Sequence, residues 1–225
     1  MNPILRRILQ LFFLVVIQAV LLFLSAWSWA WFEGWLYVSL YFLCLIAASV
    51  IMLPGHTEVV AERSKGAAGG KTWDIWLTRL MVIPTFGLLV IAGLDQRFGW
   101  QPDFNFFSQI AGVGLFLLGY VVVVWAMASN KFFSSVVRIQ AERGHCAVTG
   151  GPYRFIRHPG YAGMLVSALG GILLLRSTWA MIPYTLYLVI VIIRTALEDK
   201  TLRAELPGYG EYARQTRFRL LPGIW

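Results

Sequence analysis

Long apolar blocks, separated by shorter polar segments, dominate the chain. Six such blocks are candidate membrane spans, at residues 8–31, 35–53, 75–94, 109–128, 161–175 and 179–195. A bilayer core of about 30 Å needs about 20 apolar residues per helix, and the first four blocks meet that length. The fifth is short at about 1.5 Å rise per residue. The pattern predicts an all-α, polytopic membrane bundle of five to six transmembrane helices.

The connections between the first blocks are expected to be simple. Residues 32–34 are predicted to form a minimal turn between the first two spans, and residues 54–72 a flexible polar connection with a glycine-rich end. The first block follows Arg6 and Arg7, as in a signal peptide. It is longer than a typical signal core and no A-x-A cleavage site follows, so we expect a retained span.

Composition agrees with a membrane protein. Hydrophobic residues make up 58% of the 225 residues, charged residues only 13%, and the mean hydropathy is +0.67. A soluble domain usually carries about twice that share of charge. Cys44 and Cys146 have neither the spacing of a metal site nor that of a disulfide framework, so no metal is expected.

The positive charges are distributed unevenly across the predicted membrane. With six spans both termini share a side, and that side receives all but two of the 19 Lys and Arg residues, the exceptions being Arg97 and Arg176. The positive-inside rule then predicts that both termini lie in the cytoplasm. We attribute the net charge of +8 to a role in membrane topology and in contact with anionic lipid head groups. No nucleic-acid partner is expected.

The chain changes character after residue 129. Residues 130–160 form a polar stretch between two spans, and it contains many side chains that pack. A connection of this length in a compact protein is usually functional or disordered, and this composition favours a structured element at the membrane face. We therefore divide the chain into scaffold helices at residues 1–128 and a catalytic region with a cytosolic tail at residues 129–225.

Three features of this second region could carry chemistry. The first is the run Gly150–Tyr161, where glycines permit close approach of a ligand, although its Arg residues could instead anchor to head groups. The second is the pair Arg194 and Glu198, which share a helix face because they lie four residues apart; an exposed ion pair is the simpler alternative. The third is the basic, aromatic tail at residues 207–223, which favours an interfacial anchor.

Together these runs resemble the isoprenylcysteine carboxyl methyltransferase family and its phospholipid methyltransferase relatives. The shared pattern is a GPYrxxRHPxYxG loop, an RxxxE(E/D) helix end and a Y-x-x-Y…P tail, over residues 130–225. The resemblance implies a methyl transfer from S-adenosylmethionine at the cytosolic face, without a metal. It also implies a lipophilic acceptor within the bilayer.

The resemblance also assigns residues. The cofactor contacts that it implies are Gln140, His145, Cys146, Ala147, Val148, Tyr153, His158, Pro159, Gly160, Tyr161 and Glu198. The match of Gln140 needs a two-residue gap. Arg194 corresponds to an Arg that faces the substrate carboxylate, and we treat Arg194 and Glu198 as the catalytic pair. Asp199 replaces the family's commoner Glu, which leaves its role open.

Several functions remain open at this point. The favoured one is carboxyl O-methylation of an isoprenylcysteine-type substrate, because Arg can hold a carboxylate in a bidentate manner. An N-methyltransferase acting on a phospholipid or amine would have the same fold. A sterol-reductase-like NADPH enzyme is disfavoured because Ala162, Gly163 and Met164, not an acid, follow Tyr161. A non-catalytic protein would be expected to lack the loop His and Tyr or the Glu.

Overall fold

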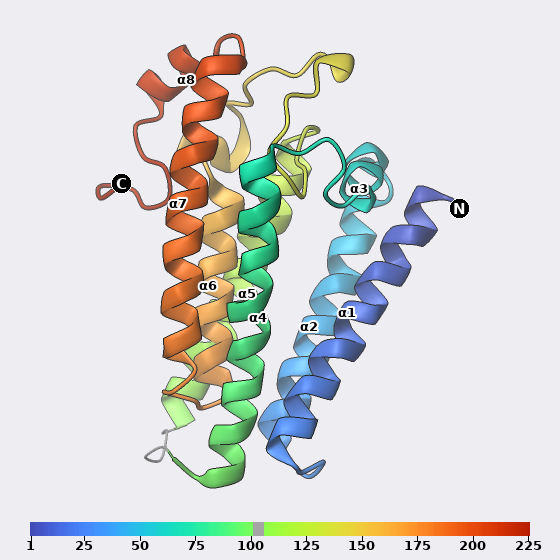
Figure 1. Ribbon diagram of the computed structural model, residues 1–225, viewed down its shortest axis with the longest axis vertical. Helices are drawn as coiled ribbons and strands as arrows, with labels where there is room; N and C mark the ends of the chain where they lie inside the picture. The colour runs from blue at the N-terminus through green and yellow to red at the C-terminus, as the bar shows by residue number, and fades with distance from the viewer. Residues whose placement is uncertain (101–105) are drawn as a thin grey trace.

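The computed structural model describes residues 1–100 and 106–225, and every regular element within those ranges is helical (Figure 1). The α-helices are α1 (Pro3–Ala26), α2 (Phe32–Met52), α3 (Thr57–Ser64), α4 (Thr72–Phe98), α5 (Phe106–Ser129), α6 (Pro159–Leu174), α7 (Met181–Glu205) and α8 (Tyr209–Gln215). Two 3-10 turns, η1 (Ala141–Arg143) and η2 (Gly151–Arg154), lie between α5 and α6. The all-α prediction is confirmed.

Five of these helices are long and apolar enough to cross a bilayer: α1, α2, α4, α5 and α7. The sixth, α6, has 16 residues and spans about 24 Å at 1.5 Å per residue, less than the bilayer core. The expectation of five to six spans, with the short one fifth among the six blocks, is therefore confirmed. The chain is an integral membrane protein by the length and composition of its helices.

The predicted turn at residues 32–34 is wrong. Helix α1 ends at Ala26, Trp27 adopts a left-handed conformation with φ of 53°, and α2 already begins at Phe32. Aromatic packing accounts for the shift, because Trp29 stacks on Phe23 at 5.2 Å and its carbonyl accepts a hydrogen bond from the indole of Trp35 at 2.8 Å. These contacts fix residues 27–31 as the turn.

The connection at residues 54–72 is more ordered than predicted, because it contains α3. Val59 and Glu62 on this helix are almost fully buried, and the side chain of Gln10 on α1 donates to the carbonyl of Ser64 at 3.2 Å. The helix is short and mostly polar, so the hydropathy of the segment gave no sign of it. The helix α3 is stabilised by packing against α1 and not by the intrinsic helix propensity of its residues.

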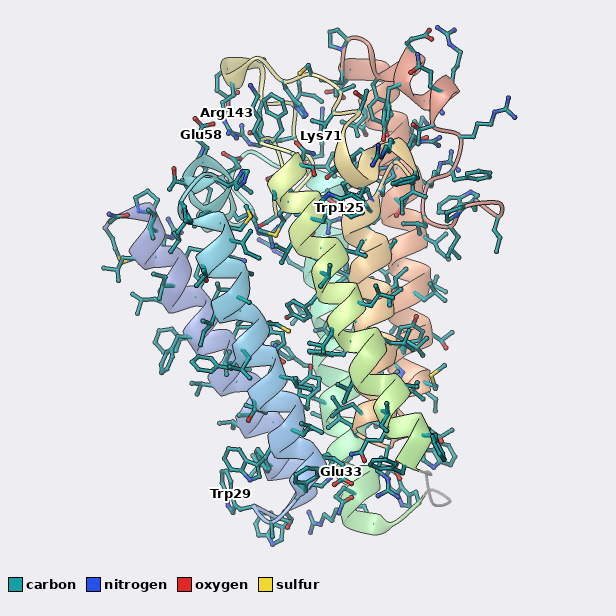
Figure 2. All side chains as sticks on the ribbon, turned by 180° about the vertical axis from the view of Figure 1, so that it is seen from behind. Trp29, Glu33, Glu58, Lys71, Trp125 and Arg143 are labelled. Carbon is teal, nitrogen blue, oxygen red and sulfur yellow. The ribbon has the colours of Figure 1, made fainter. Side chains whose placement is uncertain are left out.

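The long helices run side by side, and the polar elements gather at one end of the bundle (Figure 1). That end holds both termini, α3, α8 and the segment between α5 and α6 (Figure 1). Figure 2 shows Glu58, Lys71 and Arg143 there, and Trp29 and Glu33 at the opposite end. The end that carries the predicted chemistry is therefore also the end at which the chain enters and leaves the bundle.

Helices α5 and α6 cross in direct backbone contact through glycines. A Cβ atom on Gly119 would lie 2.4 Å from the amide nitrogen of Ser167, and one on Gly170 would lie 2.3 Å from that of Phe116. Gly112 and Gly163 meet the facing backbone in the same way. Small residues at this spacing allow membrane helices to approach closely. The crossing fixes α6, and with it the run His158–Tyr161, against α5.

We expect Gly119→Ala to destabilise the protein, because its new methyl group overlaps the backbone of α6. Overpacking of this kind costs about 1–3 kcal/mol. A Cβ atom on Gly114 of the same helix would meet no described atom within 4 Å, so Gly114→Ala is the matched control and should be neutral. The melting temperatures of both variants in detergent test this. Equal melting temperatures would contradict the close crossing.

Candidate active site

The segment between α5 and α6 is irregular, and ion pairs attach it to α3. Arg138 donates to Glu62 at 2.7 Å, and Arg143 donates to Glu58 at 2.8 Å, both partners lying on α3 (Figure 2). Arg143 also donates to the carbonyl of Lys131 at 2.8 Å. The carboxylate of Glu62 is buried, yet hydrogen bonds from Arg138 and Lys65 hold its pKa below the usual value. Helix α3 is thus the support on which this segment rests.

A glycine is required where the segment turns back toward α6. Gly151 has φ of 58°, and a Cβ there would lie 2.2 Å from the hydroxyl oxygen of Ser129. Both the backbone conformation and the space exclude other residues. The turn places Tyr153 inward, where its hydroxyl accepts from the amide of Asn130 at 3.2 Å. Burial raises the pKa of Tyr153, so its hydroxyl stays protonated.

A buried carboxylate on α7 organises the surroundings of the predicted site. Asp199 is 1% exposed and accepts hydrogen bonds from Arg157 at 2.7 and 3.3 Å. Arg203 and Arg219 donate to the same carboxylate at 3.1 and 3.2 Å, and the hydroxyl of Tyr209 donates at 3.0 Å. These groups come from the loop before α6, from α7, from α8 and from the tail. The residue whose role the sequence left open is therefore a structural centre.

The tail pairs with the loop before α6. The backbone N–H groups of Arg157 and His158 donate to the carbonyls of Phe218 and Arg219, each at 2.9 Å. The guanidinium of Arg157 also donates to the carbonyls of Thr216 and Arg217 at 2.7 Å. The tail predicted as an interfacial anchor thus forms part of the scaffold of the loop.

A second buried carboxylate joins α4 to α7. Asp74 is fully buried and receives Arg194 at 2.6 and 3.1 Å, in the two-point geometry that favours arginine. Asp74 also accepts the backbone N–H of Val137 at 2.7 Å. Arg194 donates further to the carbonyl of Ser135 at 3.0 Å, and its guanidinium carbon lies 5.2 Å from the centre of the Tyr161 ring. Its Nη1 lies 4.0 Å from the sulfur of Met81.

These contacts enclose a pocket of about 110 Å³ at the polar end of the bundle. Most of the predicted site residues line it: His145, Cys146, Ala147, Val148, Tyr153, His158, Gly160, Tyr161, Arg194 and Glu198. Pro159 and Gln140 are not among the lining residues. The fold therefore brings the loop and the helix end together around one space.

Gln140 is fully buried and committed to the loop. Its amide nitrogen donates to the carbonyl of Phe132 at 2.7 Å, and its amide oxygen accepts from Arg143 at 2.5 Å. Its backbone N–H points to Nδ1 of His145 at 3.2 Å. That bond requires an unprotonated Nδ1, and burial together with Arg138 lowers the pKa of His145. His145 is therefore neutral at pH 7, with its proton on Nε2.

The loop and the helix end meet directly at Tyr161 and Glu198. The hydroxyl of Tyr161 donates to Oε2 of Glu198 at 2.5 Å, and the ring of His158 stacks on that of Tyr161 with centres 5.8 Å apart. Nε2 of His158 is buried without a hydrogen-bond partner among the described residues, since Asp199 lies 3.8 Å away. The pocket thus presents one carboxylate, one unmatched imidazole nitrogen and several aromatic rings.

Tyr209 and Tyr212 complete the wall of the pocket, although the sequence analysis did not include them among the site residues. They lie three residues apart on α8 and so share a face. Tyr212 donates to the carbonyl of Tyr153 at 2.7 Å, and Tyr209 donates to Asp199. Burial raises the pKa of both phenols. The Y-x-x-Y spacing was the signal that could have identified them.

Asp199→Asn should destabilise the polar end, because three guanidinium groups would lose their common counter-charge. Removing one partner of a buried pair typically costs about 3–5 kcal/mol. Glu211→Gln is the control, since the Glu211–Arg214 pair on α8 is exposed and its loss should change nothing measurable. Melting temperature and protease cleavage within residues 216–225 are the measurements. An unchanged melting temperature in Asp199→Asn would refute the structural role.

Comparison with known proteins finds similarity to the same family that the sequence motifs resemble. The profile of the isoprenylcysteine carboxyl methyltransferase (ICMT) family matches residues 112–204. A probable protein-S-isoprenylcysteine O-methyltransferase of Oryza sativa subsp. indica is 27% identical over 146 residues, 64% of this chain and 76% of its own length.

Two further relatives match a shorter part of the chain. The protein-S-isoprenylcysteine O-methyltransferase of Schizosaccharomyces pombe is 32% identical over 81 residues, 36% of this chain and 34% of its own length. The protein-S-isoprenylcysteine O-methyltransferase A of Arabidopsis thaliana is 29% identical over 83 residues, 37% and 39% of the two chains. The part of the chain that is similar to the isoprenylcysteine carboxyl methyltransferase family, residues 112–204, includes the glycine crossing, the loop and the helix end.

Proposed function

We propose that this protein is an S-adenosylmethionine-dependent methyltransferase that esterifies the carboxylate of an isoprenylcysteine-type acceptor at the cytosolic face of the membrane. The observation that carries the proposal is the shared pocket, in which Tyr161 of the loop bonds Glu198 of the helix end. The family match and the names of the relatives agree with it. In this proposal residues 129–225 form the catalytic region and residues 1–128 the scaffold.

The donor groups of the pocket suit the proposed cofactor. Glu198 would accept a hydroxyl or amine, and His158 has a buried nitrogen without a partner in the described ranges. The rings of Tyr153, Tyr161 and Tyr212 offer faces that attract a positive centre such as a sulfonium. The volume of about 110 Å³ is below the roughly 300–1,000 Å³ of small-molecule sites. Entry of the whole cofactor therefore needs α8 or the loop to move outward.

The other cofactor contacts that we propose lie in the loop before α6 and in the first turn of α6. They are Gln140, His145, Cys146, Ala147, Val148, Pro159 and Gly160. Gln140 and Pro159 do not line the pocket, so we propose a positional role for these two. Gln140 fixes the backbone beside His145, and Pro159 begins α6 next to the lining residues His158 and Gly160.

Methyl transfer requires little from the protein beyond the alignment of the two reactants. The bound cofactor would supply a methyl group already activated by the sulfonium charge. An ionised carboxylate has no proton to lose, so no general base is required. Arg194 would orient that carboxylate through Nη1, since Nε and Nη2 are committed to Asp74 and Ser135. Holding both reactants in line and away from water is proximity catalysis.

The cytosolic orientation rests on charge. Arg97 and Arg176 contact Trp27 and Glu33 respectively, and Glu33 lies at the end opposite Lys71 and Arg143 (Figure 2). The segments that carry most of the other basic residues lie at the end with both termini (Figure 1). A positive excess on one side favours the cytoplasm for that side. The residues that line the pocket come mainly from the segment between α5 and α6, from the first turn of α6, from α7 and from α8, and these elements meet at the same end of the bundle (Figure 1).

Glu198→Gln should weaken S-adenosylmethionine binding by about 10- to 100-fold, the value of a hydrogen bond to a charged group. Calorimetry on detergent-purified protein measures it. Glu205→Gln on the same helix is the control, because Glu205 pairs with Lys71 at the surface and its loss should leave the affinity unchanged. Binding of NADPH without S-adenosylmethionine binding would overturn the methyltransferase proposal.

The acceptor is tested with labelled methyl donor and two substrates, an S-farnesylated cysteine derivative and phosphatidylethanolamine. A methyl ester releases methanol in base, whereas an N-methyl group does not. We expect base-labile label on the prenylcysteine only. Base-stable label on the amine lipid would show that the protein is instead an N-methyltransferase.

A further inference from the structure

A second and larger cavity lies deeper in the bundle. It measures about 430 Å³, within the range of ligand sites, and its lining comes from α1 to α7, the scaffold helices included. Along α1 the lining runs from Arg7 to Gln18, about 16 Å at 1.5 Å per residue. A space that is long, mostly apolar and embedded among membrane helices suits a single hydrocarbon chain.

The polar groups within the body of this cavity are largely satisfied by one another. Tyr37 donates to the side chain of Gln18 at 3.2 Å, and Tyr37 stacks with Tyr41 at 6.3 Å. Tyr41 in turn packs edge-on to Tyr120 at 5.8 Å. These residues present rings to the cavity, so the body of the space recognises apolar material. Charge enters only at its polar end, through Arg7 and Arg63.

Arg63 differs from the other inward-facing arginines of this end. Arg138, Arg157 and Arg194 each pair with a carboxylate. Within the described ranges Arg63 pairs with none, and its Nε is buried without a hydrogen-bond partner. Glu62, its neighbour, is taken by Lys65 and Arg138. A partly buried cation without a counter-ion is costly, and an anionic ligand would relieve that cost.

The surroundings of Arg63 increase the free-energy cost of its unpaired charge. Burial lowers the pKa of its guanidinium to about 9, and the nearby cations Arg7 and Arg194 act in the same direction. At neutral pH the group is therefore still charged. The side chain of Arg7 has the amide oxygen of Gln10, at 3.3 Å, as its described partner, which leaves its charge uncompensated too.

Arg63 also lies on the boundary between the two cavities. It lines the large cavity, and its guanidinium lies 5.2 Å from the centre of the Phe133 ring, which lines the small pocket. Tyr161, the partner of Glu198, is among its electrostatic neighbours. An anion bound by Arg63 would therefore sit beside the pocket in which we propose that the methyl donor binds, at the head of the apolar cavity.

Resting on the proposed function, we propose that Arg63, assisted by Arg7, binds the carboxylate of the acceptor while its prenyl chain occupies the 430 Å³ cavity. Arg194 alone does not supply the charge, because Asp74 neutralises it. Arg63 provides the net positive charge, and Arg194 provides orientation through Nη1. Arg63 and Arg7, which supply the net charge, both lie outside residues 112–204, so the scaffold half of the chain selects the acceptor.

The unmodified protein provides the first test, without methyl donor present. The ligands are a farnesyl thioether with a terminal carboxylate, the matching carboxamide, and a farnesyl phosphate, each titrated calorimetrically in detergent. We expect the carboxylate to bind at least about tenfold more tightly than the carboxamide, as a charge-assisted bond implies. Equal affinity for these two, or a preference for the phosphate, would overturn the proposal.

Substitutions then test which residue supplies the positive charge that binds the carboxylate. Arg63→Gln should abolish the preference for the carboxylate while leaving the affinity for the carboxamide unchanged, a result that an unfolded variant cannot give. Arg6→Gln, at an exposed position of α1 next to Arg7, is the control for both substitutions. Arg7→Gln should reduce the preference in part. A preference that persists in Arg63→Gln would refute the role of Arg63.

This test can fail separately from the proposed function. If methyl transfer to prenylcysteine occurs but the carboxylate preference is absent or independent of Arg63, the inference fails and the function stands. If the preference depends on Arg63 but S-adenosylmethionine does not bind, the anion site stands and the methyltransferase proposal fails.

Discussion

The architecture of the polar end depends on burying one carboxylate, that of Asp199. A buried ion is tolerated only when charges and hydrogen bonds match it, and here three guanidinium groups and a phenol do so. Those partners belong to four separate segments of the chain. The three segments outside α7 must therefore converge on the same point of α7, and the walls of the pocket follow from that convergence.

Asp74 performs the same task on the scaffold side, where it holds α4, α7 and the backbone of Val137 together. Between these two occupied acids stands Glu198, whose described partner is the single hydroxyl of Tyr161. Structural carboxylates are saturated, whereas the carboxylate proposed for cofactor binding keeps unused acceptor capacity. The same contrast separates Arg194, which is paired, from Arg63, which has no carboxylate partner in the described ranges.

Much of the fold could be predicted because it depends on local pattern. Hydropathy located each membrane helix to within five residues at either end, except that α7 continues ten residues beyond the predicted end at residue 195. The short α6 was recognisable from its length. The motif also indicated which residues would gather around the pocket. The turn at residues 27–31 and helix α3 were not foreseen, because aromatic stacking and contact with α1 determine them.

The buried ion pairs were not predicted because their partners lie far apart in the sequence. Arg194 and Asp74 are 120 residues apart in sequence, and nothing local indicates that they meet. The position of Asp74 at the start of an apolar span was a usable sign, since such residues tend to face the bundle interior. The sequence also could not indicate that the side chain of Gln140 would form hydrogen bonds with Phe132 and Arg143. Only the packed structure shows which polar groups remain free.

The pairing of the tail with residues 157–158 has a consequence for biosynthesis. Residues 216–219 follow α6 and α7 along the chain, so they are translated after both helices. During that interval the backbone of the loop lacks its partners and Asp199 lacks Arg219. The loop before α6 therefore reaches its full set of hydrogen bonds only after residues 216–219 have been translated.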